Sequence, residues 1–216
     1  IEELGESIIN ASKDKKIIIL GGGGLNYDNE EIKNYREFMK EIKPKVFISR
    51  DSISFENYNG IADYNYDGIE CAFFLNKAFT PLKINKEYIV KNFDNMLVPN
   101  IKSKIKNIVE THHCYEFRQP KQYLENSELL ISSVPNDYLN VYANAKEIYT
   151  DRVHTALSGL VFGSTVKLYS NSPRVSLFEK LDANLVTEEL IKLDFSKLQK
   201  LQNNEIKFLK SIGEKL

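Results

Sequence analysis

An arginine and a histidine, separated by one residue, lie at the start of a predicted helix, where their side chains suit an anionic ligand. They are Arg152 and His154, within the stretch EIYTDRVHTALSGLVFG at 147–163. Thr150 or Asp151 can cap this helix, because each side-chain oxygen accepts hydrogen bonds from the first turn. The free N–H groups and the helix dipole favour a phosphate or carboxylate there. The spacing therefore predicts a site for an anion at the start of this helix. The alternative is that Arg152 pairs with a nearby acid while His154 only packs.

The element that must position these side chains reads as a strand followed by an amphipathic helix. Ile148 and Tyr149 end a short buried strand, and Gly163 is suited to the left-handed residue that ends a helix. Between them, apolar residues recur at helical spacing and predict one buried face: Val153, Ala156, Leu157, Leu160 and Val161. Strand, turn and helix would together hold Arg152 and His154 at the carboxyl end of a sheet.

A run of four glycines marks a second strand–turn–helix element. Lys16–Leu20 reads as a buried strand, and a helix capped by Asp28 or Asn29 runs to Ile42. Glycines allow a ligand to approach backbone N–H groups, so we expect ligand contacts from Gly22, Gly23 and Gly24. The run matches neither G-x-G-x-x-G nor G-x-x-x-x-G-K-[ST]. A tight turn without a ligand is the alternative.

Two further arginines follow predicted strands. Most cationic side chains of this protein are lysines. An arginine therefore suggests that its position needs a planar guanidinium group, which can form two parallel hydrogen bonds. Arg50 follows the strand Val46–Ser49, and ligands of open α/β sheets bind at such carboxyl ends. Arg174 follows the strand Thr165–Tyr169, and we expect it to contact the ligand with its neighbours Asn171 and Ser172. The alternative for the first site is an Asp51 cap with Arg50 at the surface.

Strands alternate with helices through two halves of the chain, which predicts parallel sheets with helices on both sides. The further elements expected are strands at 71–75, 87–93 and 128–132, and helices at 3–12, 101–109, 174–181 and 195–216, with a short helix from Pro135. The fold class is therefore α/β, with two doubly wound, Rossmann-like domains. We place the first domain at residues 1–84, the second at residues 85–195, and a C-terminal helix at residues 196–216.

Composition excludes several classes of function. A net charge of −1 gives no general field for nucleic acid. No apolar run of about 18 residues and no secretion signal is visible, so we expect a cytoplasmic protein. His112, His113 and Cys114 are adjacent, but neighbouring residues on a strand point to opposite faces, and we expect no metal site. No cofactor is expected either.

The run TDRVHTALSGLVFGSTVKLYSNSPR resembles the signature of the polysaccharide pyruvyl transferase family. That signature is (T/S)-D-R-φ-H, an apolar helix, a glycine, a strand, and then Asn-Ser. The preceding SSVPNDYLNVYANA resembles the segment before it in archaeal-type members, and the glycine run and the R-D-x-x-S element at 50–54 resemble motifs of the N-terminal half. The resemblance covers residues 125–181 well and residues 15–75 loosely.

The resemblance implies a fold similar to GT-B glycosyltransferases and the transfer of a pyruvyl group from phosphoenolpyruvate to two hydroxyls of a sugar. It assigns Arg152, Val153 and His154 to donor binding and places Arg50 near them, with the N-terminal half on the acceptor side. Asp151, Arg152 and His154 are the catalytic candidates. The pathway implied is cell-surface glycan synthesis, which is compatible with peripheral association with membrane-bound glycan assembly.

The family's opening strand and Asn-x-Gly-Asp loop, which precede its glycine run, are absent here. We therefore expect either a fragment or a compact relative. Three other interpretations stay open. They are a nucleotide-sugar glycosyltransferase of the GT-B type, a non-catalytic or truncated glycan-binding relative, and a nucleotide-binding dehydrogenase, which the missing G-x-G-x-x-G disfavours.

Overall fold

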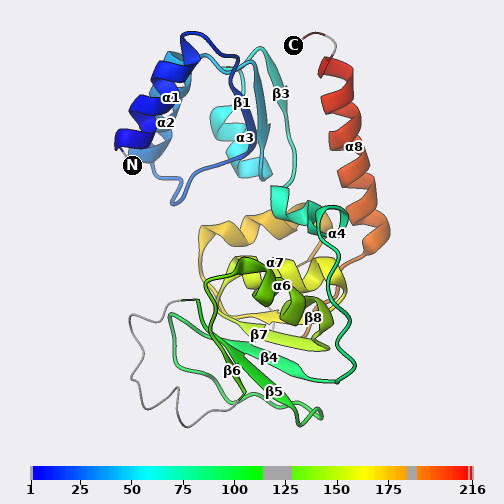
Figure 1. Ribbon diagram of the computed structural model, residues 1–216. Coiled ribbons are helices and arrows are strands. Elements are labelled where there is room, and N and C mark those ends of the chain that lie inside the picture. Colours follow the sequence, from blue (N-terminus) through cyan, green and yellow to red (C-terminus); the bar gives the residue numbers. More distant parts are fainter. Residues whose placement is uncertain (1, 114–127, 184–188, 214, 216) are drawn as a thin grey trace. The chain divides into compact units, whose positions relative to one another are not determined.

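The computed structural model describes residues 2–113, 128–183, 189–213 and 215, and its chain divides into two compact units (Figure 1). The first unit comprises Ile1–Cys71, Ser176–Leu181 and Phe195–Leu216, and the second comprises Ala72–Val175 and Asp182–Asp194. The division thus falls earlier than residue 84. The connecting segment belongs to the second unit, because its Leu82 and Ile84 N–H groups donate to side chains of the helix at 135–144.

The first unit is built on a three-stranded parallel sheet in the order β1-β2-β3. Its strands are β1 (Ile18–Gly22), β2 (Val46–Ser49) and β3 (Tyr64–Tyr66). Its helices are α1 (Glu2–Ser12), α2 (Asn29–Ile42), α3 (Ser52–Tyr58) and α8 (Phe195–Gly213). Asp28 and Asp51 cap α2 and α3 by accepting from Glu31 N and Ser54 N, because carboxylate oxygens satisfy the free donors of a first turn.

The central strand β2 is packed on both faces, and all four of its residues are buried. The edge strand β1 is not buried as predicted, because Ile18 and Leu20 are 46% and 48% exposed. Phe47 on one face contacts Met39 of α2 and Tyr58 of α3. Val46 and Ile48 on the other face contact Ile212 of α8, and α8 runs alongside β3 (Figure 1). The predicted C-terminal helix is therefore part of the core of the first unit.

The predicted strand at 71–75 is wrong. Cys71–Phe74 form a 3₁₀ turn, and α4 (Leu75–Ala78) continues it. The third strand is instead Tyr64–Tyr66, which pairs in parallel with Val46–Ile48. Its YNY sequence carries no apolar run, so the pairing depends on the neighbouring strand and not on a local pattern.

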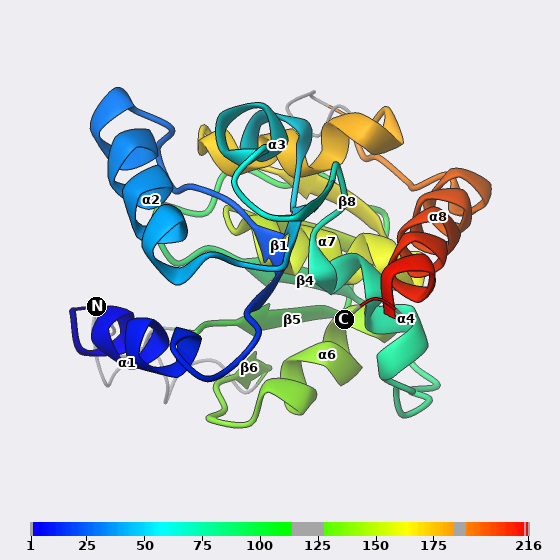
Figure 2. The ribbon, with the colours of Figure 1, turned by 90° about the horizontal axis from the view of Figure 1, so that it is seen from above.

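The second unit contains a five-stranded parallel sheet in the order β6-β5-β4-β7-β8. Its strands are β4 (Ile89–Asn92), β5 (Ile108–Thr111), β6 (Leu129–Leu130), β7 (Glu147–Thr150) and β8 (Thr165–Leu168). Two helices, α6 (Pro135–Asn144) and α7 (Val153–Phe162), cover one face of this sheet (Figures 1 and 2). The strand order reverses between β4 and β7, as in a Rossmann sheet, and ligands of such sheets bind beside this switch point.

Helix α7 lies directly against β7. The predicted apolar face is confirmed, because Ala156, Leu157 and Leu160 have no exposed surface. A Cβ atom on Gly159 would overlap Ile148 of β7, so only glycine permits this close approach. Gly163 ends the helix with φ of 99°, as predicted, and its N–H donates to the last carbonyls of the helix.

The predicted helix at 101–109 is wrong. Residues 101–107 form no helix, and Ile108–Thr111 form β5, paired with β4. Ile101, Ile105 and Ile108 all pack against the buried cluster of Ile89, Phe93 and Tyr149. Spacings of four and three residues are those of a helical face as well, so the sequence alone could not separate the two structures.

The predicted helix at 174–181 begins at Pro173 and is a 3₁₀ helix, Pro173–Leu181. Within the described residues, every helix is too short or too polar to cross a lipid bilayer.

Candidate functional site

The residue at the N-cap position of α7 does not cap the helix with its side chain. The helix begins at Val153, and Arg152 occupies the N-cap position without a capping hydrogen bond. The prediction that Thr150 or Asp151 caps the helix is therefore wrong. Thr150 Oγ1 accepts instead from Arg152 N at 2.9 Å, one residue before the helix. An uncapped first turn keeps the positive end of the helix dipole available to an external anion.

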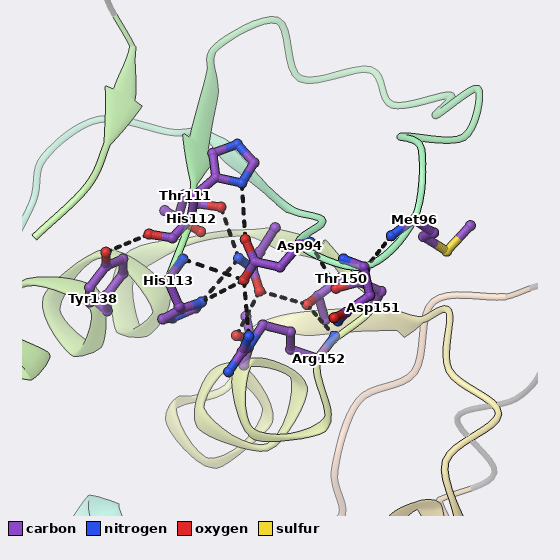
Figure 3. Close-up of polar contacts among 12 residues, drawn as sticks. Asp94, Met96, Thr111, His112, His113, Tyr138, Thr150, Asp151 and Arg152 are labelled. Carbon is purple, nitrogen blue, oxygen red and sulfur yellow. Dashed lines mark hydrogen bonds and ion pairs between the residues drawn. The ribbon is translucent and has the colours of Figure 1, made fainter. Parts of the chain in front are cut away.

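Asp151 holds the loop that follows β4. Its carboxylate oxygens accept from Asp94 N at 3.2 Å, Asn95 N at 2.6 Å and Met96 N at 3.0 Å (Figure 3). The residue is buried. Through these contacts Asp151 fixes the loop at 94–96. Its participation in catalysis stays a prediction.

Asn92 ties the strands of the switch point together. This residue ends β4 and is fully buried. Its side-chain N–H donates to the Thr111 carbonyl of β5 at 2.8 Å, while its Oδ1 accepts from Thr150 of β7 at 2.9 Å and Thr155 of α7 at 2.8 Å. Every polar atom of this amide is therefore engaged, which fixes the start of α7 relative to the sheet.

Asp94 is the charged centre of the site (Figure 3). Its carboxylate is 2% exposed and lies 3.1 Å from His112 Nδ1, 3.1 Å from His113 Nδ1 and 3.2 Å from Arg152 Nη1. Burial raises the pKa of this carboxyl, but hydrogen bonds from His112 and His113 outweigh it and hold the pKa well below its usual range. Asp94 is therefore ionised at neutral pH and fixes one side of the Arg152 guanidinium.

A small hollow opens beside the uncapped helix. Its volume is about 260 Å³, and its lining residues are Asn95, Asp151, Arg152, Val153, His154, Ser170, Ser172 and Arg174. Arg174 Nε is buried in the protein, without a hydrogen-bond partner among the described atoms. Two guanidinium groups and a helix amino end thus lie beside this hollow, together with the Asp151 carboxylate.

A larger hollow adjoins the small one. Its volume is about 480 Å³, and it shares Arg152 and His154 with the first. The remaining lining residues come from β5 to α7: His113, Ser132, Ser133, Pro135, Tyr138, Leu139, Tyr142, Thr155 and Ser158. The His113 and Tyr138 rings lie 4.5 Å apart with a 30° angle between their planes. This hollow is therefore mainly aromatic and apolar, whereas the first is charged.

The second unit thus brings six of the predicted site residues to one hollow: Asp151, Arg152, Val153, His154, Ser172 and Arg174. Asn171 lies on the same loop, but it is exposed and does not line the hollow. Arg152 both pairs with an acid and lines the hollow, so the two alternatives raised for it are compatible.

Arg50 lies in the first unit, and its guanidinium is bonded inside that unit. It is 8% exposed and donates to the Gly24 carbonyl and to Tyr27 Oη. Asp51 does cap α3, as the alternative stated, but Arg50 is not at the surface. Ligand binding by Arg50 stays a prediction.

The loop after the glycine run binds a carboxylate of its own chain. Glu31 accepts from the N–H groups of Leu25, Asn26 and Tyr27 at 2.6, 2.8 and 2.6 Å. These bonds hold the pKa of Glu31 below its ordinary value, although partial burial opposes them. Cβ atoms on Gly23 and Gly24 would approach Ser54 Oγ and Tyr58 Oη closely, so packing already requires these glycines. Contacts of Gly22, Gly23 and Gly24 with a ligand stay a prediction.

Sequence reasoning missed Asn92, Asp94 and the joint role of the two histidines. A signal was present, because Asp94 directly follows a predicted buried strand, as Arg50 does. What the sequence does not contain is the adjacency of β4 and β7, which brings Asp94 to Arg152.

No protein-family model and no curated protein matches this chain. Solved structures do resemble it. Staphylococcus aureus MnaA, in a co-structure with UDP, aligns with 95% of this chain over 72% of its own at 13% identity and a TM-score of 0.53. A Listeria monocytogenes protein described as a UDP-N-acetylglucosamine 2-epimerase aligns with 96% of this chain over 72% of its own, at 12% identity and a TM-score of 0.53.

These likenesses concern the fold. The chain is an α/β protein of two Rossmann-like parallel-sheet units and has a GT-B-like fold.

Proposed function

We propose that this chain is a GT-B-type enzyme that transfers the pyruvyl group of phosphoenolpyruvate to two hydroxyls of a sugar. The observation that carries the proposal is the small hollow at the switch point, where Arg152, His154 and Arg174 surround the uncapped start of α7. Its 260 Å³ lies below the range of about 300–1,000 Å³ typical of drug-sized ligands, which supports a compact anion. The sequence signature at 150–174 supports the same donor.

Phosphoenolpyruvate carries a carboxylate and a phosphate close together. Planar guanidinium groups bind both kinds of group through paired hydrogen bonds, which set position as well as charge. Arg152 is anchored by Asp94 on one Nη atom, and its remaining donors serve the ligand. Arg174 lines the same hollow and supplies a second guanidinium group for an anionic oxygen.

The reaction requires three proton transfers: one to the methylene carbon and one from each of the two sugar hydroxyls. As the first sugar hydroxyl adds to the enol carbon, its proton leaves and the methylene carbon gains a proton. The second hydroxyl then displaces phosphate from that carbon, loses its proton, and closes the cyclic ketal. His154 lines both hollows, so it can exchange protons with groups in either one, and we assign it to proton transfer.

Calorimetric and thermal-shift titrations with phosphoenolpyruvate, free phosphate and UDP-sugars test the donor. We expect selective stabilisation by phosphoenolpyruvate, lost in Arg152→Ala. A protein that responds to none of these compounds, or equally in wild type and variant, contradicts the proposal.

A nucleotide-sugar enzyme is the second candidate, and the likeness to MnaA bound to UDP favours it. In that case the two arginines and the start of α7 would hold a diphosphate. The same titration separates the candidates, because stabilisation by a UDP-sugar without a response to phosphoenolpyruvate would select this one.

A further inference from the structure

We infer that the larger hollow of the second unit binds the ring of a hydroxyl-rich ligand, namely the acceptor sugar. The inference rests on the proposed function, which names a sugar as acceptor. It assigns that sugar to the same unit as the anion site, whereas the sequence resemblance places the acceptor side in the N-terminal half. The larger hollow and the small one share two lining residues, Arg152 and His154.

The shape and lining of the hollow suit a saturated ring. Its 480 Å³ lies within the usual size range for small-molecule sites. The walls combine ring surfaces of His113, Tyr138 and Tyr142 with the side chain of Leu139. A sugar ring has C–H groups on its faces and hydroxyls around its edge, so apolar walls and polar groups must both be present.

The hydrogen-bonding capacity of the lining selects hydroxyl groups. Ser158 Oγ donates to the His154 carbonyl at 2.8 Å, Ser132 Oγ donates to Asp137 at 2.6 Å, and Thr155 Oγ1 donates to Asn92 at 2.8 Å. A hydroxyl has one donor proton but two acceptor lone pairs, so these three groups can only accept from a ligand. A polyol supplies the matching donors, whereas the carbonyl oxygens of a pyrimidine base would meet no hydroxyl donor from these three residues.

The rings are held in fixed positions. Asp94 contacts His113 Nδ1 at 3.1 Å, and Tyr142 Oη contacts His113 Nε2 at 3.1 Å. Tyr138 Oη donates to the His112 carbonyl at 2.6 Å. Side chains fixed before binding lose little conformational entropy when a ligand arrives, so the hollow is preorganised for a ring. A sugar placed there brings its hydroxyls beside His154, the group assigned to proton transfer.

Saturation-transfer NMR on the intact chain tests this site. The probes are methyl glycosides of glucose, galactose and mannose, with uridine as the rival ring. Leu139→Trp fills the hollow, and Val134→Trp adds the same side chain at an exposed position that does not line it. We expect transfer to at least one glycoside in wild type and in Val134→Trp, a fivefold or greater loss in Leu139→Trp, and phosphoenolpyruvate affinity changed less than twofold in both variants.

Each other outcome overturns the inference. No transfer to any glycoside, equal transfer in Leu139→Trp and wild type, or transfer to uridine in place of the glycosides would each contradict a sugar site here. Failure of the proposed donor is distinguishable. In that case phosphoenolpyruvate gives no response, while the glycoside signal still depends on Leu139.

Discussion

At the scale of single residues, the site depends on one buried carboxylate that holds three nitrogen-bearing side chains. Asp94 is 2% exposed and contacts His112, His113 and Arg152 within 3.2 Å. Burying a charge is unfavourable unless partners compensate it. Among the partners here, Arg152 lines both hollows and His113 lines the larger one. Asp94 therefore acts through Arg152 and His113 and positions them for the ligand.

Asp94→Asn tests this positioning role. The variant keeps the shape of the side chain but removes the charge that orients Arg152. We expect phosphoenolpyruvate affinity to fall about tenfold, equivalent to ~1.4 kcal/mol. In the Arg152→Ala background the same change should have no further effect, as a calorimetric double-mutant cycle would show. Additive losses would mean that Asp94 does not act through Arg152.

His154→Ala separates proton transfer from binding. If His154 transfers protons, kcat should fall about 10²–10⁴-fold. The KM for phosphoenolpyruvate should change little, because the charges of Arg152 and Arg174 remain. Steady-state kinetics measures both constants, with Asn171→Ala as a control on a neighbouring loop residue that does not line the hollow. Full turnover without His154 would remove it from the mechanism.

At the scale of elements, the site is formed where β4 and β7 lie side by side and the strand order reverses. Asn92 and Asp151 fasten the two strand ends to each other and to the loop at 94–96. The amino end of helix α7 lies at this junction, and Gly163 ends the helix at its carboxyl terminus. The helix is therefore positioned by its packing on β7 and not by a capping side chain.

Gly163→Ala should destabilise the protein, because Gly163 adopts φ of 99°, a conformation that a Cβ atom disfavours by about 1–2 kcal/mol. Gly213→Ala is the matched control. This glycine ends α8 with open space around it and no positive φ, so alanine there should be neutral or slightly stabilising. Urea unfolding of both variants measures the difference, and equal stabilities would contradict the assigned backbone role.

At the scale of the whole molecule, the chain leaves the first unit after Cys71 and returns to it with Ser176–Leu181 and Phe195–Leu216. The return is anchored by a buried carboxylate. Glu205 of α8 is 3% exposed and accepts from Ile69 N at 2.9 Å. Burial raises the pKa of Glu205, while the bond from Ile69 and the charge of Lys180 partly offset this rise.

The raised pKa gives stability a defined dependence on pH. Glu205 binds its proton more tightly in the folded state, so its contribution is fully present below its unfolded pKa of 4.5 and is lost as pH rises through the folded value. Glu205→Gln keeps an acceptor for Ile69 N but cannot ionise. We expect the free energy of unfolding of the variant, relative to wild type, to increase between pH 4 and pH 7. Urea unfolding at both values measures it, and an unchanged difference would contradict the raised pKa.

The sequence by itself determined the elements that depend on local chemistry. Neighbouring residues alone predict the apolar face of α7, the end of that helix at Gly163, and the strand at 46–49. The structure confirms all three. The α/β class and the Rossmann-like organisation followed from their alternation. The arginines and histidine of one hollow were also recognisable, because they follow predicted strands.

Only the tertiary structure decided what depends on residues far apart in the chain. The strand at 64–66 depends on pairing with β2, and the segment at 101–107 packs on the core although its local spacing favours a helix. Asp151, one of the two predicted caps of α7, accepts instead from three N–H groups of the loop at 94–96. Asp94 meets Arg152 only because β4 and β7 pair, and a contact across 58 positions leaves no trace in local sequence.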